Sequence, residues 1–127
     1  MLEAGLIYGC FIFMLVATLD IGHYMFLHQT MVERVRSAAR YGVARTFDQA
    51  AIQNMVLYNS PTAPAGASSI FGLNTSNVSV TETAATLNTP AYLIVKVSGW
   101  RYFRFTPMQA GQPMGQNISI MLPMELP

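Results

Sequence analysis

Three polar side chains, Asp20, His23 and Tyr24, interrupt an otherwise apolar stretch near the start of the chain. At spacings of three and four residues they share one face of a helix, where a carboxylate can accept hydrogen bonds from an imidazole or a phenol. Two functions fit this set: a proton or ion site within a membrane, or a hydrogen-bonding hub that His23, Tyr24 or a neighbouring chain satisfies. Because proton pathways need several polar groups, the hub is the favoured interpretation.

Other residues with chemical potential give weaker patterns. His23 and His28 lie about 140° apart around a helix, so one helix cannot direct both toward a single metal ion. Aromatic residues alternate with two arginines over residues 100–105, which suits base stacking, but aromatic packing on a helix is the favoured interpretation. The sequence offers no nucleophile with a base and an orienting group, no phosphate loop and no carboxylate pair. We therefore expect no enzyme, cofactor or metal site.

The polar set lies inside a long apolar run, residues 4–32, where Asp20 is the one formally charged side chain among 29 positions. As an α-helix this run would be about 44 Å long, more than the roughly 30 Å apolar core of a bilayer. Charged residues form 10% of the chain, against about a quarter of an average soluble domain. The run must therefore cross a membrane or be buried among copies of itself. A net charge of +1 gives no general attraction to nucleic acid, which we do not expect as a partner.

Residues at the start of the run are candidates for contacts between subunits. Gly5 and Gly9 form a G-x-x-x-G pair, which lets a second helix approach closely. Glu3 is either a solvated terminal charge or a group that neutralises the α-amino group of another chain in a helical bundle. Free cysteine is usually a small buried hydrophobe, which is the favoured interpretation of Cys10.

Beyond the apolar run, small residues recur at steps of three and four while arginines occupy other positions. This small-residue stripe predicts that the helix continues as an amphipathic stem. The stripe suits close packing between helices of different chains, and packing on the chain's own domain explains it equally well. Its members are Val32, Val35, Ala39, Gly42, Thr46 and Ala50.

The remaining sequence predicts a small α+β domain. We expect the first helix to break near Thr46 to Asp48, with Asp48 capping a second short helix that ends at Asn59. Loops are expected at Pro61 to Ser69 and at Thr106 to Gln116, which are rich in proline and glycine or small residues. Strands forming an antiparallel sheet are predicted at Val78–Thr83, Tyr92–Val97, Trp100–Phe105 and Ile118–Leu122.

Two further details concern the predicted sheet and the division of the chain. In the second strand, Lys96 points its face toward water and leaves Leu93, Val95 and Val97 for the core. Gly99 marks a bulge or turn after that strand. The fold class is thus α+β, with a hydrophobic helix and stem over residues 1–47 and a globular domain with a short helix and an antiparallel sheet over residues 48–127.

The sequence LDIGHY at residues 19–24, followed by RVRSAARYGV at residues 34–43, resembles the TadE-like pilin family of the tight-adherence branch of type IV pilus systems. In that family an apolar helix ends in an acidic-hydrophobic-glycine step and continues into a stem of the form A-A-R-x-G-A-R. The resemblance covers residues 5–45 well. Residues 51–56 resemble the family's second helix, and the C-terminal half is similar in pattern only.

The resemblance implies a route through the membrane. Such pilins are made with a basic leader that a prepilin peptidase removes, and they stay in the inner membrane until an assembly platform draws them into a filament. No Lys or Arg precedes Glu3, as in a mature chain, although family members usually carry a glutamate at the fifth mature position. The resemblance also favours the interchain role for Glu3.

The leading expectation is a structural subunit of an extracellular type IV-like filament with identical subunits as partners. Residues 5 to about 47 would form its core and the sheet domain its outside. The alternatives are a minor, pilus-priming subunit retained in the inner membrane, and a single-span membrane protein that binds or regulates a larger complex. The expected interface residues are Glu3, Gly5, Gly9, Asp20, His23, Tyr24, Val32, Val35, Ala39 and Gly42.

Overall fold

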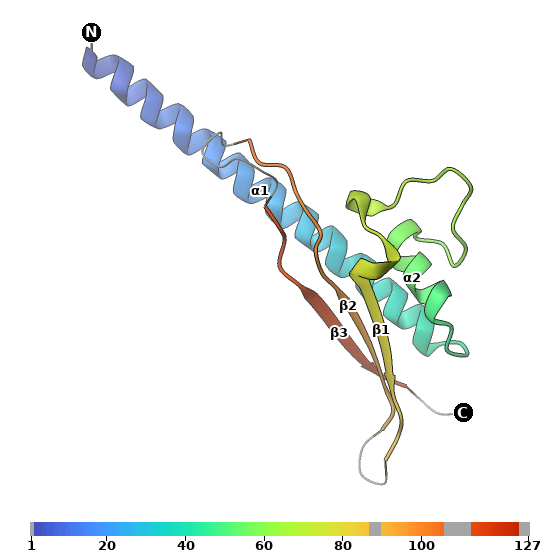
Figure 1. Ribbon diagram of the computed structural model, residues 1–127. Helices are drawn as coiled ribbons and strands as arrows, with labels where there is room; N and C mark the ends of the chain where they lie inside the picture. The colour runs from blue at the N-terminus through green and yellow to red at the C-terminus, as the bar shows by residue number, and fades with distance from the viewer. Residues whose placement is uncertain (1, 87–89, 106–112, 125–127) are drawn as a thin grey trace.

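The computed structural model describes residues 2–86, 90–105 and 113–124. A long helix and a short one precede a three-stranded sheet, and the sheet and the short helix lie beside one half of the long helix (Figure 1). The N-terminal half of the long helix extends away from them. The predicted α+β arrangement is therefore confirmed. The elements are α1 (Leu2–Val43), α2 (Gln49–Tyr58), the 3₁₀ turns η1 (Ile70–Gly72) and η2 (Thr75–Asn77), and strands β1 (Val78–Thr83), β2 (Tyr92–Val97) and β3 (Ile118–Pro123).

The 42 residues of α1 form one uninterrupted helix, about 63 Å long at the usual rise per residue. No proline occurs in it, and its length follows from the absence of any strong helix breaker. The helix ends at Val43, so the predicted break before Asp48 is confirmed. The predicted division of the chain after residue 47 falls in the loop between α1 and α2.

Asp48 caps the start of α2 and the helix ends at its C-cap, Asn59, as the sequence predicts. The Asp48 carboxylate accepts hydrogen bonds from the backbone N–H groups of Ala50 (3.0 Å) and Ala51 (3.2 Å), which satisfies two donors that the first turn leaves unpaired. Asn59 adopts a left-handed conformation (φ 58°) and its N–H donates to the Met55 carbonyl. This geometry closes the last turn, and Pro61 then prevents any continuation.

The sheet is antiparallel with the order β1-β2-β3. Leu93, Val95 and Val97 of the central strand are fully buried, whereas Lys96 is exposed, as the two-residue alternation predicts. The buried face packs on the C-terminal half of α1 and on α2, so that α1 and the sheet domain share one core. That core includes Met31, Val35, Ala38 and Ala39 from α1 and Ile52, Val56 and Leu57 from α2.

The members of the small-residue stripe that lie on α1 pack on the chain's own domain, whereas Thr46 and Ala50 lie beyond the end of α1 at Val43 and are exposed. Val35 and Ala39 are fully buried, and a Cβ added at Gly42 would lie 2.6 Å from Leu93 Cδ2 and 2.7 Å from Ile52 Cδ1. Val32 lies half-buried at the edge of the same cluster. Of the two explanations for the stripe, packing between chains and packing on the chain's own domain, the structure has the second. The assignment of Val35, Ala39 and Gly42 to a surface between subunits is therefore corrected, because the domain already covers these residues.

The third predicted strand, Trp100–Phe105, is not formed. After a turn at Gly99 (φ 75°), this segment makes a single antiparallel bridge, between Arg101 and Met114. The Tyr102 N–H donates to the Pro113 carbonyl (3.2 Å), but proline has no N–H with which to extend a ladder. The rest of the predicted loop, residues 106–112, lies outside the described part of the chain.

Trp100 secures the start of this segment to the core. Its side chain is fully buried, and its indole Nε1 donates to the Gln116 carbonyl (2.9 Å). The Gly115 N–H donates to the Trp100 carbonyl (2.8 Å), and a Cβ added at Gly115 would overlap the indole ring. A residue without a side chain is therefore required at position 115.

Replacing Gly115 with alanine should lower the free energy of unfolding by about 1–3 kcal/mol, the usual cost of overpacking a core. Denaturant titration of the detergent-solubilised protein, followed by Trp100 fluorescence, measures it. Gly22→Ala is the matched control, because a Cβ at Gly22 meets nothing within 4 Å and alanine favours a helix. Equal stability of Gly115→Ala and the parent protein would contradict the packing argument.

Candidate assembly and membrane interface

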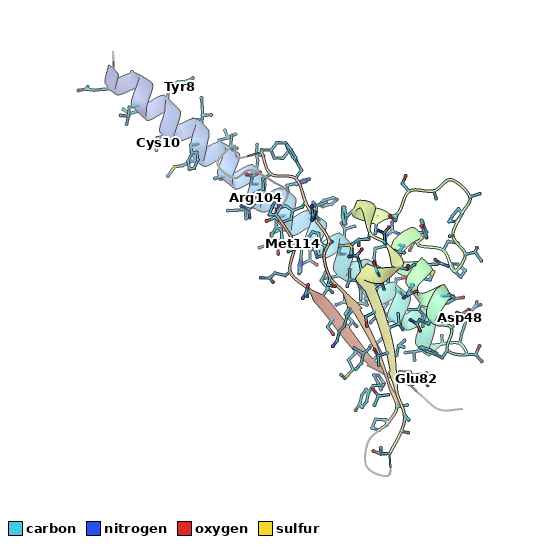
Figure 2. All side chains as sticks on the ribbon, in the orientation of Figure 1. Tyr8, Cys10, Asp48, Glu82, Arg104 and Met114 are labelled. Atoms are coloured by element: carbon cyan, nitrogen blue, oxygen red, sulfur yellow. The ribbon has the colours of Figure 1, made fainter. Side chains whose placement is uncertain are left out.

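The N-terminal half of α1 is bare. Residues 3–15 are all exposed, and the most apolar 18-residue window of the helix has none of its residues buried, although the helix is long and apolar enough to cross a membrane. Tyr8 and Cys10 project from this part of the helix, far from the sheet (Figure 2). The large exposed apolar residues include Leu6, Ile7, Tyr8, Phe11, Ile12, Phe13, Met14, Leu15 and Leu19.

Exposing such an apolar surface to water is energetically unfavourable. Each large apolar side chain gains roughly 1.5–3 kcal/mol when it is fully buried, and the bare helix presents many of them side by side. Contiguous apolar patches of this kind mark a surface that contacts lipid or another protein. The chain therefore needs a second apolar environment that its own domain does not provide.

Glu3, Gly5 and Gly9 lie on this bare part of α1, at its N-terminal end. All three are exposed, and a Cβ added at either glycine would meet nothing within 4 Å. The fold of one chain thus gives neither glycine a packing role. Their assignment to contacts between subunits stays a prediction, as does that of Glu3.

Asp20 lies where the bare half of α1 meets the domain, and it is half-buried. Its Oδ1 accepts a hydrogen bond from the backbone N–H of Phe105 (2.6 Å). A partner for this carboxylate was expected on its own helix or on a neighbouring chain, and the structure supplies one from a segment 85 residues later. Asp20 therefore acts as a hydrogen-bond acceptor within the chain, toward the backbone of Phe105.

His23 and Tyr24 contact the same segment, residues 100–105, which we call the aromatic strap. The His23 ring meets Phe105 edge-on, with centroids 5.7 Å apart. Tyr24 stacks parallel to Trp100 at 6.1 Å and also lies 4.9 Å from the Tyr102 ring. The structure thus brings Asp20, His23 and Tyr24 together against the strap. The expected packing of aromatic residues on the helix is confirmed for Trp100, Tyr102 and Phe105.

A pocket of about 400 Å³ opens between α1 and the strap. Its charged residues are Asp20 and Arg104, and Ala17 and Ile21 add apolar walls. The Arg104 guanidinium donates to the Tyr102 hydroxyl through Nη2 (2.8 Å) and lies over the Tyr102 ring at 5.5 Å. Arg104 lies beside α1 (Figure 2) and lines the same pocket as Asp20.

The arginines of the stem form weak surface contacts. Arg36 donates to Glu33 at 2.9 Å, but the two side chains are 46% and 66% exposed. Arg45 lies over the Tyr41 ring at 5.0 Å. Exposed contacts of this kind contribute little to stability, so these arginines leave a positively charged surface beside the apolar span.

The hydrogen bond between Asp20 and Phe105 is the feature that sequence reasoning missed. The spacing of Asp20, His23 and Tyr24 pointed to their common helix face, and the aromatic content of residues 100–105 pointed to packing on a helix. Neither pattern identifies which turn of a long helix is the docking site. A backbone N–H has no side-chain type by which the sequence could reveal it.

In comparisons with known proteins, no protein-family model, curated protein or solved structure matches the chain. Within the described ranges, no group of three or more His, Cys, Asp or Glu side chains is placed to hold a metal ion.

Replacing Asp20 with leucine should release the end of the strap without unfolding the sheet, because hydrogen bonds to a charged group contribute roughly 1.5–3 kcal/mol and the core lies elsewhere. Amide hydrogen exchange should become faster at Phe105 and stay unchanged at Val95. Asp20→Asn keeps an acceptor oxygen and is the matched control. Unchanged exchange at Phe105 in Asp20→Leu would show that Asp20 does not hold the strap.

Proposed function

We propose that this chain is a structural pilin subunit, of the kind that the TadE-like family represents, and that it polymerises through the N-terminal half of α1 into an extracellular type IV-like filament. The observation that carries the proposal is the bare apolar half of α1 on a helix whose other half is covered by a small domain. Before assembly the same half would lie in the inner membrane. Its partners would be identical subunits, the assembly platform and the prepilin peptidase.

The shape of the subunit supports this proposal. The core of the described domain lies against the C-terminal half of α1 (Figure 1), and the strap continues the contact to Asp20. The exposed part of α1 before Asp20 can therefore pack side by side in many copies, with every domain on the outside. Moving an apolar helix from lipid to other apolar helices exposes little surface to water, so packing geometry decides the association. The contact from Asp20 to Phe105 also supplies the carboxylate with a partner before any neighbour arrives.

Electron microscopy of the full-length protein, produced together with a tight-adherence assembly system, tests the proposal. We expect filaments built from this chain, with the sheet domain on the surface. A reporter fused after Pro127 should lie outside the cytoplasm. A chain that remains a monomer in the bilayer under these conditions, or a cytoplasmic reporter, would overturn the proposal.

Gly5→Leu and Gly9→Leu should each impair filament formation, because a leucine side chain would prevent close approach of a second helix. Electron microscopy scores filament number and diameter. Gly22→Leu is the matched control: all three sites are open in the single chain, but Gly22 lies on another face of α1, about 220–260° around the helix from the other two. Filaments of normal number and diameter in both Gly5→Leu and Gly9→Leu would eliminate this contact.

A second candidate function is a single-span membrane module that binds or regulates a larger complex. The exposed arginines Arg36, Arg40 and Arg45 beside the span favour it, because positively charged flanks tend to stay in the cytoplasm. A minor, pilus-priming subunit would have the topology of a pilin but would remain in the membrane. The reporter after Pro127 separates the module from both pilin functions, and filament formation separates the two pilin functions from each other.

A further inference from the structure

The aromatic strap continues along α1 beyond the sheet. In Figure 1 it is the orange segment that follows β2 and runs beside α1 toward the bare half of the helix. Its far end is fixed to Asp20 through the backbone of Phe105. Phe103 and Phe105 are 59% and 54% exposed, with their rings in edge-to-face contact at 5.4 Å. The strap thus presents two large apolar side chains that the described part of the domain does not cover.

The end of the strap lies at a defined distance from the N-terminal end of the span. Glu3 and Asp20 are the first two charged residues of the chain, and the 17 helical steps between them measure about 26 Å. That length is close to the roughly 30 Å apolar core of a bilayer. When α1 spans a membrane, Glu3 lies at one boundary and Asp20, with Phe105 attached, lies at the other.

The chemistry of the strap fits that boundary. An extended segment cannot enter the apolar core, because its backbone groups would lose their partners there. Phenylalanine side chains, in contrast, can enter the boundary between headgroups and acyl chains, and arginine side chains extend their charged ends to the headgroups. Arg101 is exposed and precedes Phe105 by four residues on the same strap, a separation of at most about 14 Å in an extended chain. The pocket beside the strap is lined by both apolar and charged residues.

We propose that the aromatic strap is an interfacial membrane anchor. Phe103 and Phe105 enter the boundary between acyl chains and headgroups, and Arg101 contacts lipid phosphates. The anchor fixes how far the domain stands from the bilayer while the subunit is in the membrane. This inference rests on the membrane stage of the proposed function and is independent of the filament stage.

Site-specific fluorescence in vesicles tests the anchor. Cys10 is the only cysteine, so Cys10→Ser gives a background in which Phe103→Cys carries an environment-sensitive dye. The full-length protein is reconstituted in vesicles of phosphatidylethanolamine and phosphatidylglycerol with nitroxide-bearing lipids. We expect blue-shifted emission at position 103 and a loss of intensity that is larger with headgroup nitroxides than with nitroxides deep in the acyl chains.

Two further labelled variants are the controls. Phe47→Cys is the matched one, because Phe47 is an exposed phenylalanine beyond the far end of α1, and it should show neither a blue shift nor quenching by lipid. Leu15→Cys, on the bare half, should be quenched most by the deep nitroxides. Position 103 behaving like position 47 while position 15 is quenched would overturn the anchor alone. Position 15 escaping quenching would overturn the membrane stage and the anchor together.

A second copy of the chain is the other occupant that the measurement distinguishes. A blue shift at position 103 that increases with the ratio of protein to lipid, without quenching by lipid nitroxides, would show that another subunit covers the strap and would overturn the anchor. The phosphate contact is tested by adding Arg101→Glu, which should reduce the quenching at position 103. Arg40 is an exposed arginine of the stem, and Arg40→Glu should leave the quenching at position 103 unchanged. An equal loss of quenching in both variants would overturn the contact between Arg101 and lipid phosphates.

Discussion

The structure depends on the unequal covering of α1. The core that the sheet and α2 build reaches along α1 from about Met31 to Gly42, and a domain of this size cannot cover a helix about 63 Å long. The close approach at Gly42 brings the domain tightly onto the stem, and the other half of α1 keeps its apolar side chains exposed. Both the need for lipid or neighbours and the position of the domain at one end follow from this division.

Asp20 marks where that division lies. An unpaired carboxylate next to an apolar environment costs several kcal/mol, and the backbone N–H of Phe105 reduces that cost. The strap reaches this turn because Trp100 is fixed in the core at its start and because Tyr24 stacks on Trp100 and Tyr102 along its course. The hydrogen bond from Phe105 to Asp20 and a row of aromatic contacts together place the end of the strap.

Local patterns were sufficient for much of the fold. The length of α1, the caps of α2 and the inward face of β2 each follow from residues close in sequence, whose spacing determines which face they share. The small-residue stripe was ambiguous, because close packing on one's own sheet and on another helix require the same residues. The strand expected at Trp100–Phe105 failed because its partner segment contains Pro113, and the partner of Asp20 was missed because it is a backbone group 85 positions away. The roles of Glu3, Gly5 and Gly9 concern other chains, which the fold of a single chain does not determine.

The continuity of α1 has a mechanical consequence. The same backbone hydrogen bonds run from the bare half into the stem without a hinge, so a pull on the exposed end travels along the helix axis directly to the contact between stem and sheet. There the force acts as shear, and the buried side chains from Met31 to Ala39 resist it together instead of separating one after another. A subunit held by its bare half would therefore carry tension as a rigid rod, with its domain fastened lengthwise to it.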